Sequence, residues 1–198
     1  MIKGSFILIR IEKDIIKIIE EDKWMMELLK AAKSLNLPDW WICAGFVRSK
    51  IWDVLHNFKE RTAMPDIDVI YYDQTNLEES MEKKYEEELN RLLSAIPWSV
   101  KNQARMHLAN KILPYASAVD AIAKFPETAT ALGVKLDDRN NLILAAPHGI
   151  HDVVNLVVKP TPFFGESEER KLVYEERVRK KDWQSIWTGV KFSNPDIN

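Results

Sequence analysis

Residues 40–49 read Trp-Trp-Ile-Cys-Ala-Gly-Phe-Val-Arg-Ser, and residues 66–73 read Asp-Ile-Asp-Val-Ile-Tyr-Tyr-Asp. The first run opens with aromatic and apolar residues typical of a buried strand, which Gly45 ends. Apolar residues then recur at helical spacing, which predicts a helix over residues 46–58. A strand, a glycine, a helix and a second strand therefore follow one another, and this order predicts an α/β fold.

The second run places two carboxylates side by side. Side chains alternate along an extended strand, so Asp66 and Asp68 share one face while Ile67 and Val69 point to the other. Two aspartates at this spacing lie about 7 Å apart. Like charges so close repel unless a cation or hydrogen-bond donors offset them, and Mg²⁺ prefers oxygen ligands. The pair therefore predicts a site for Mg²⁺ or Mn²⁺.

The turn at Gly45 is suited to a phosphate group. A glycine lets a phosphate approach the backbone, and the first amides of the following helix favour an anion. Arg48, one turn into that helix, can add forked hydrogen bonds to the same phosphates. Together with the Asp pair, these residues predict a site for a nucleoside triphosphate and its metal. Each of these residues also has a purely structural explanation. Gly45 would then be a simple turn glycine, Arg48 a surface residue paired with a carboxylate, and Asp66 and Asp68 solvated side chains at a strand end.

The rest of the chain continues the alternation of helices and strands. Helical spacing occurs over residues 12–35, as one helix or two in series, and over residues 77–95, 117–124 and 166–187; strand patterns occur over residues 98–104 and 153–158, with a hairpin over 130–146. The sequence contains no internal repeat and no clear linker. We therefore expect one unit over residues 1–198, with an N-terminal helix and a C-terminal helical extension.

Composition excludes several classes of protein. The 198 residues are 46% hydrophobic, enough to bury a core, and the formal net charge is −2. A chain without a basic field is not expected to bind DNA. Cys43 is the only cysteine and lies in the apolar strand, so we expect an inert core residue and no disulfide framework.

The sequence also bears on location. No run of about 18 apolar residues is present, so no membrane span is expected. The apolar run over residues 6–9 is shorter than the core of a signal peptide and has no cleavage site. We read it as mature sequence and expect a cytoplasmic protein.

The glycine turn and the aspartate pair resemble motifs of a known family. Residues 40–72 look like the head domain of class II CCA-adding enzymes and bacterial poly(A) polymerases, which belong to the polymerase-β-like nucleotidyltransferase superfamily. In those enzymes Gly-Gly or Gly-Ser, followed by Val-Arg-Asp, precedes a strand with Asp-x-Asp. The corresponding residues here are Ala44-Gly45-Phe46-Val47-Arg48-Ser49 and Asp66-Ile67-Asp68. The resemblance implies a small mixed sheet with flanking helices.

A longer stretch is similar to a group of small bacterial nucleotidyltransferase-family proteins. The similarity runs from about residue 24 to residue 163. Its shared signatures match Asn102-Gln-Ala-Arg-Met-His107, Phe125-Pro-Glu-Thr-Ala-Thr130 with Gly133-Val134, and the run from Asp152 to Lys159-Pro160.

The chain departs from the family pattern at three places. Ala44 replaces the first glycine, and Ser49 replaces the aspartate after the arginine. Such enzymes also carry a third carboxylate on a later strand, but the strand predicted over residues 98–104 has no acidic residue. Asp152 is the best later candidate because it opens an apolar strand pattern. The chain also lacks the length for the neck, body and tail that hold transfer RNA, so full CCA addition is not expected.

The sequence thus predicts a metal-dependent nucleotidyltransferase. The resemblance implies that Asp66 and Asp68 bind the metal, that Ala44, Gly45 and Arg48 bind the NTP, and that Asp152 assists as a third catalytic acid. The acceptor hydroxyl stays open among a small molecule, a protein side chain and an RNA end. Two alternatives remain: a catalytically silent nucleotide-binding or regulatory module, favoured by the missing third carboxylate, and, less favoured, an RNA-binding protein without chemistry.

Overall fold

A five-stranded mixed sheet forms the centre of the computed structural model, which describes residues 8–193. Its strands are β1 (Trp41–Cys43), β2 (Ile67–Tyr71), β3 (Trp98–Asn102), β4 (Gly133–Leu136) and β5 (Leu142–Ala145). The order is β3-β2-β1-β4-β5; only β2 and β3 run parallel, and the other neighbours are antiparallel. The expectation for residues 6–9 lies mostly outside the described residues.

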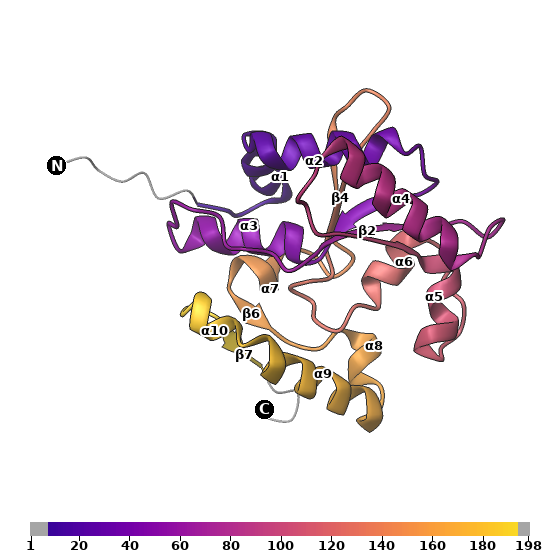
Figure 1. Cartoon of the computed structure of the whole chain (residues 1–198). Coiled ribbons are helices and arrows are strands. Elements are labelled where there is room, and N and C mark those ends of the chain that lie inside the picture. The colour runs from indigo at the N-terminus through magenta and orange to yellow at the C-terminus, as the bar shows by residue number, and fades with distance from the viewer. Residues whose placement is uncertain (1–7, 194–198) are drawn as a thin grey trace.

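Four helices and the larger core lie on one side of the sheet (Figure 1). They are α1 (Glu12–Glu20), α2 (Lys23–Ser34), α3 (Gly45–Leu55) and α4 (Glu79–Leu92). The alternation of strand side chains supplies this core from the sheet: Ile42 of β1 and Val69 of β2 are fully buried in it. The helix predicted over residues 12–35 is thus two helices in series.

The opposite face carries a smaller apolar cluster. It contains Trp41, Cys43 and Ile70 from the sheet, covered by α6 (Ala118–Ala123). Cys43 is fully buried, as expected for an inert core residue, and burial raises the pKa of its thiol. Because the cluster fills only part of this face, the end of β2 that carries the aspartates is left for the site.

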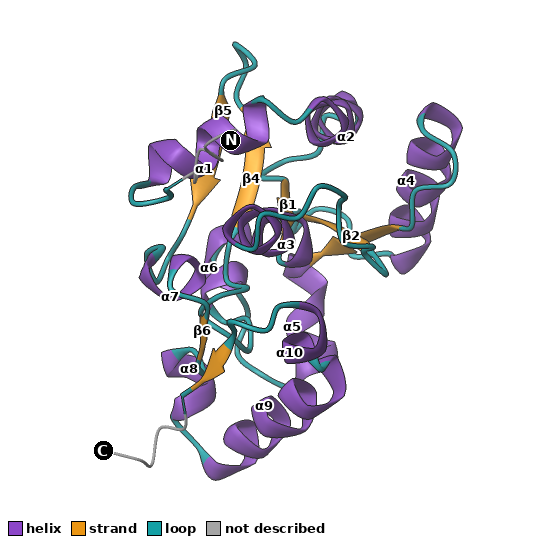
Figure 2. Cartoon of the chain, turned by 90° about the vertical axis from the view of Figure 1, so that its left-hand side faces the viewer, coloured by secondary structure: helices purple, strands orange, loops and turns teal. Residues whose placement is uncertain are grey.

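The C-terminal segment crosses beneath that face as a series of short elements and one long helix (Figure 2). They are α7 (His151–Val154), β6 (Val157–Val158), α8 (Pro162–Gly165), α9 (Glu168–Lys181), α10 (Trp183–Ile186) and β7 (Lys191–Phe192). The remaining helix, α5 (Gln103–Asn110), belongs to the middle of the chain and follows β3 directly. β6 pairs in parallel with β7. No helix within residues 8–193 combines the length and apolar character needed to cross a membrane.

Two predicted elements differ in the structure. The strand predicted over residues 153–158 is wrong for its first half, because residues 151–154 form the helical turn α7 and only Val157 and Val158 are extended. Leu156 separates the two with a φ of 58°, a value that no strand residue adopts. The strand predicted over residues 98–104 ends at Asn102, whose side chain accepts a hydrogen bond from the Ala104 amide and caps α5.

Candidate active site

The aspartate pair lies at the start of β2. Asp66 is exposed just before the strand, whereas Asp68 is half-buried within it, beside Ser99 of β3. Burial and the neighbouring charge of Asp66 raise the pKa of Asp68 to about 6, although Ser99, Arg177 and Lys181 act in the opposite direction. Two adjacent carboxylates, one of them desolvated, form an acidic site that a divalent cation would relieve.

This charge arrangement fits a metal, but with two protein ligands only. No ion pair joins Asp66 or Asp68 to a cation within 4.0 Å in the described part of the chain. Mg²⁺ is commonly bound by one or two carboxylates together with substrate phosphates, so a pair is sufficient for it. Asp66 and Asp68 are therefore the residues that could hold the metal.

The raised pKa of Asp68 predicts how the stability of the protein depends on pH. Because the folded-state pKa of Asp68 lies above its value of about 3.9 in the unfolded chain, the unfolded state loses this proton first. This group therefore makes the free energy of unfolding fall as pH rises from about 4 to about 6, and then level off. Asp68→Asn should remove that loss and stabilise the protein at pH 8 by about 1–3 kcal/mol, without doing so at pH 4. Urea denaturation at both pH values checks this, and equal stability of the two proteins at pH 8 would refute it.

The turn before α3 faces the same site. The amide of Ala44 donates to the Leu132 carbonyl, and the amides of Val47 and Arg48 donate to the Ala44 carbonyl. The Gly45 and Phe46 amides between them have no hydrogen-bond acceptor within residues 8–193. A Cβ atom on Gly45 would meet only Arg48 Nη2, at 3.9 Å. The Gly45 amide is therefore a free donor beside open space, as a bound phosphate requires, whereas Phe46 is buried and lines neither cavity.

Ala44 occupies a backbone conformation suited to glycine. Its φ is 53° and its ψ is −113°, a combination that a Cβ atom makes costly. The strain of about 1–3 kcal/mol exceeds the extra chain entropy that glycine loses on folding, about 0.5–1 kcal/mol. We therefore expect Ala44→Gly to stabilise the protein by about 1 kcal/mol, measured by urea denaturation. A destabilised Ala44→Gly variant would contradict this conformation.

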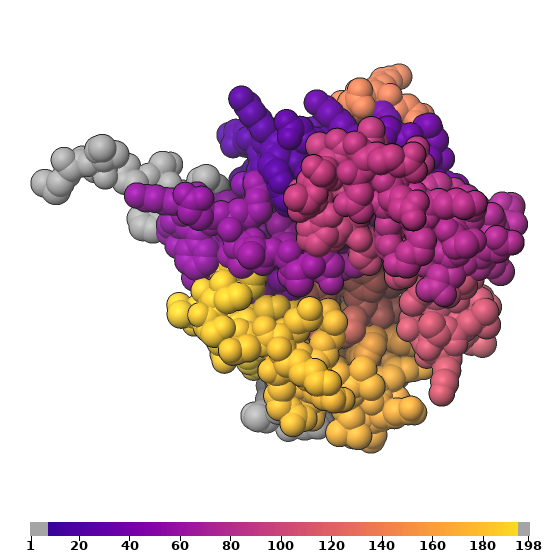
Figure 3. Space-filling view, viewed as in Figure 1, coloured from indigo at the N-terminus to yellow at the C-terminus, as the bar shows by residue number. Residues whose placement is uncertain are grey.

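The pair and the turn line one cavity. This smaller cavity, about 360 Å³, is bordered by Ala44, Gly45, Arg48, Asp66 and Asp68. A larger, open cavity of about 1010 Å³ adjoins it, and the hollow is visible between the C-terminal segment and the middle of the chain in Figure 3. Five residues line both cavities: Ala44, Asp68, Thr130, Arg177 and Lys181. Five of the six residues predicted for the site are thus brought together.

Arg48 is at the wall of the smaller cavity, but it is held more tightly than a surface arginine. Its guanidinium carbon lies 4.9 Å from the ring centre of Trp52, 4.7 Å from Trp183 and 5.2 Å from Trp187. Burial lowers the pKa of Arg48 to about 10. Its Nη2 donates to the Ser49 hydroxyl, whereas its buried Nε has no acceptor within the described residues. The guanidinium is therefore a buried cation behind the wall of the smaller cavity, and its charge favours an anionic ligand there.

Asp152 is the predicted site residue that the structure does not bring to the pair. It lies in α7, accepts a hydrogen bond from Lys159 at 3.1 Å, and lines neither cavity. Burial raises the pKa of Asp152, but hydrogen bonds from Thr128 and Lys159 outweigh this and lower it. No group of three or more Asp, Glu, His or Cys side chains in residues 8–193 could hold a metal. The expected third carboxylate therefore finds no support at Asp152.

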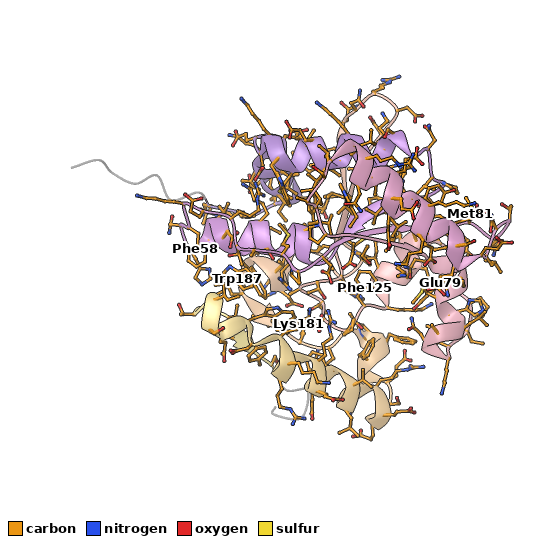
Figure 4. The ribbon with its side chains drawn as sticks, in the orientation of Figure 1. Phe58, Glu79, Met81, Phe125, Lys181 and Trp187 are labelled. Carbon is orange, nitrogen blue, oxygen red and sulfur yellow. The ribbon has the colours of Figure 1, made fainter. Side chains whose placement is uncertain are left out.

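Sequence reasoning missed the residues that α9 contributes. Arg177 and Lys181 line both cavities, yet the segment predicted only a charged helical extension. Figure 4 shows the Lys181 side chain extending from α9 toward the half of the molecule that contains the sheet. Their spacing of four residues places them on one helix face, which is the only local signal. Nothing in the sequence indicates which surface that face meets.

Comparison with known proteins shows the family and the fold of the chain. Residues 30–192 match the model of a protein family described as nucleotidyltransferase. A solved structure reported to reveal a CCA-adding enzyme head domain is 33% identical, covers 96% of this chain and 100% of its own, and superposes with a TM-score of 0.86. A search of curated proteins finds no match.

Whole CCA-adding enzymes share the fold at lower identity. The Thermotoga maritima CCA-adding enzyme complexed with tRNA is 15% identical, with 94% of this chain and 43% of that chain covered and a TM-score of 0.56. A CCA-adding enzyme complexed with CTP is 14% identical, with 90% and 43% covered and a TM-score of 0.56. The chain spans less than half the length of these enzymes.

The mixed sheet with its flanking helices has the fold of a CCA-adding enzyme head domain. The chain belongs to the nucleotidyltransferase family whose model it matches over residues 30–192. Membership supports nucleotidyl transfer as the general activity and confirms the predicted fold class.

Proposed function

We propose that this protein transfers a nucleoside monophosphate from an NTP to an acceptor hydroxyl in a reaction that depends on Mg²⁺ or Mn²⁺. One observation carries the proposal: Asp66, Asp68 and Gly45, whose amide is free, border a single cavity. Carboxylates suit a metal, and a free amide at a helix start suits a phosphate. The cytoplasmic location predicted from the sequence suits an enzyme that uses NTPs.

The residues that border the smaller cavity have different tasks in this reaction. Asp66 and Asp68 hold the metal, which when bound neutralises phosphate charge and polarises the α-phosphate for attack. The free amide of Gly45 donates to the phosphates that leave as pyrophosphate, and the Arg48 side chain adds positive charge at the wall of the same cavity. The acceptor oxygen bonds to the α-phosphorus, the bond between the α- and β-phosphates breaks, and the hydroxyl proton is released.

The acceptor stays open among a small molecule, a protein side chain and an RNA end. The larger cavity adjoins Asp68 and leaves space for any of the three beside the nucleotide. A silent nucleotide-binding module is the second candidate function. It is favoured by the lack, within residues 8–193, of a third acidic residue beside the pair, since such a residue would serve as the base for the acceptor hydroxyl.

Calorimetry of ATP and CTP binding tests the nucleotide site. We expect binding that strengthens at least about tenfold when Mg²⁺ is added, because a metal held by Asp66 and Asp68 would attract the phosphate charge. Gly45→Ala should fold normally, since its Cβ meets no atom closer than 3.9 Å, yet bind more weakly because the methyl group occupies ligand space. Gly165, where a Cβ atom meets nothing within 4 Å, provides the matched control Gly165→Ala. Equal affinity with and without Mg²⁺ would remove the metal from the proposal.

A further inference from the structure

The C-terminal helix α9 places two cations at the site. Arg177 and Lys181 lie one helical turn apart and line both cavities together with Asp68. Both are near enough that their charges lower the pKa of Asp68 against the opposing effects of burial and Asp66. The two side chains therefore stand beside the aspartate pair, on an element far from it in sequence.

Arg177 is held by a buried carboxylate. Glu127, which is 0% exposed, accepts a hydrogen bond from Arg177 Nε at 2.6 Å and another from the Thr130 hydroxyl at 2.5 Å. The amides of Thr130 and Ala131 donate to the Glu127 carbonyl, so the backbone there is fixed as well. Because a fully buried charge needs such partners, this pair fixes the direction of the guanidinium.

The contact with Glu127 uses only the Nε group of the Arg177 guanidinium. Arg177 makes no other hydrogen bond within residues 8–193, so its Nη1 and Nη2 groups remain available. The side chain is 36% exposed, which leaves those groups in reach of a ligand in the cavities. A guanidinium fixed at Nε and free at both Nη atoms is suited to a phosphate group.

Lys181 is the second available cation. It is exposed, and in the part of the chain that the structure describes it forms no ion pair within 4.0 Å. A structural explanation exists, because basic residues in the last turn of a helix interact favourably with its dipole. Arg179 lies in that same turn but lines neither cavity. A variant of Arg179 therefore distinguishes an effect on the helix dipole from an effect on ligand binding.

We propose that Arg177 and Lys181 bind the phosphates of the NTP and that Glu127 is a positioning residue that orients Arg177. This inference rests on the proposed function and extends it, since it assigns part of the triphosphate site to the C-terminal helix. Two cations that share a cavity with the free amide of Gly45 suit a chain of phosphates better than a single anion.

Binding of phosphate chains of different length tests the assignment. The probes are ATP, AMP and inorganic tripolyphosphate, each in the presence of Mg²⁺. We expect Arg177→Gln to weaken ATP and tripolyphosphate by about tenfold or more, and Lys181→Gln by about fivefold, with AMP changed less than twofold. Arg177→Lys keeps the charge without the fork and should fall between. The matched control, Arg179→Gln, should bind all three probes as the wild type does.

A double-mutant cycle tests the role of Glu127. Glu127→Gln should weaken tripolyphosphate binding when Arg177 is present and have no further effect on the Arg177→Gln background. A purely structural Glu127 would give the same effect on both backgrounds, which would overturn its positioning role. Lys181→Gln changes an exposed side chain, so it stays informative if the Glu127 variants fail to fold.

The outcomes separate the two proposals. Wild-type affinity of both Arg177→Gln and Lys181→Gln for tripolyphosphate, with weakened ATP binding by Gly45→Ala, would overturn the role of α9 and leave the proposed function standing. A wild-type protein that binds neither ATP nor tripolyphosphate would overturn both.

Discussion

Asp66→Asn and Asp68→Asn should each lower the rate of pyrophosphate release by about a thousandfold or more. Each substitution removes an anionic metal ligand, and metal stabilisation of the transition state amounts to several kcal/mol, at about 1.4 kcal/mol per factor of ten. The fold should persist because Asn is nearly isosteric with Asp and both residues lie at the cavity wall. Coupled detection of pyrophosphate, with ATP or CTP and a panel of hydroxyl acceptors that includes RNA ends, measures the rate.

Asp73→Asn is the matched control for these variants. Asp73 follows the other end of β2, where it accepts hydrogen bonds from the amide and hydroxyl of Thr75, and it lines neither cavity. Its substitution should leave the rate unchanged, and chelation of the metal by EDTA should reproduce the loss seen with the Asp66 and Asp68 variants. Asp68→Asn with full activity would end the metal assignment. A wild-type protein that binds NTP but releases no pyrophosphate with any acceptor would favour the silent module.

Trp187→Ala should lower the free energy of unfolding by about 3–5 kcal/mol. Trp187 is 2% exposed, packs edge-on against Trp52 with ring centres 5.1 Å apart, and covers the guanidinium of Arg48. Its Nε1 also donates to Asp53 at 2.9 Å. The substitution therefore removes a large buried surface, one aromatic contact of Arg48 and one of the hydrogen bonds that Asp53 accepts.

Trp187→Phe separates packing from hydrogen bonding. It keeps most of the aromatic surface and loses the donor, so we expect a cost of about 1–2 kcal/mol. Urea denaturation measures both variants, and limited proteolysis reports whether the C-terminal segment has detached. A loss below about 1 kcal/mol for Trp187→Ala would show that this segment contributes little to the stability of the fold.

The elements that the sequence predicts well are those with strong local periodicity. The helices and strands from residue 12 to residue 102 follow their hydrophobic patterns, and the hairpin over residues 130–146 is confirmed by the pairing of β4 with β5. The prediction of a strand over residues 153–158 failed because a β-branched composition does not reveal the left-handed backbone conformation of Leu156.

The residues of the candidate site likewise differ in how far the sequence could predict them. Gly45, Asp66 and Asp68 could be found because their roles depend on local spacing along two strands and one turn. The pairing of Arg177 with Glu127 joins residues 50 positions apart, and Trp187 reaches Asp53 across 134 positions. Only tertiary packing brings such groups together, and no local pattern encodes it. The same holds for Asp152, whose strand-like surroundings concealed a helical turn.

Paramagnetic broadening by Mn²⁺ tests the central claim most directly, because it maps the metal onto individual residues. In an NMR titration of the wild-type protein with Mn²⁺ and ATP, we expect the amide signals of Gly45, Asp66 and Asp68 to broaden first. In Asp68→Asn this selective broadening should disappear at the same Mn²⁺ concentration. Broadening centred on another surface, or unchanged broadening in Asp68→Asn, would contradict the metal site on which the proposed nucleotidyl transfer depends.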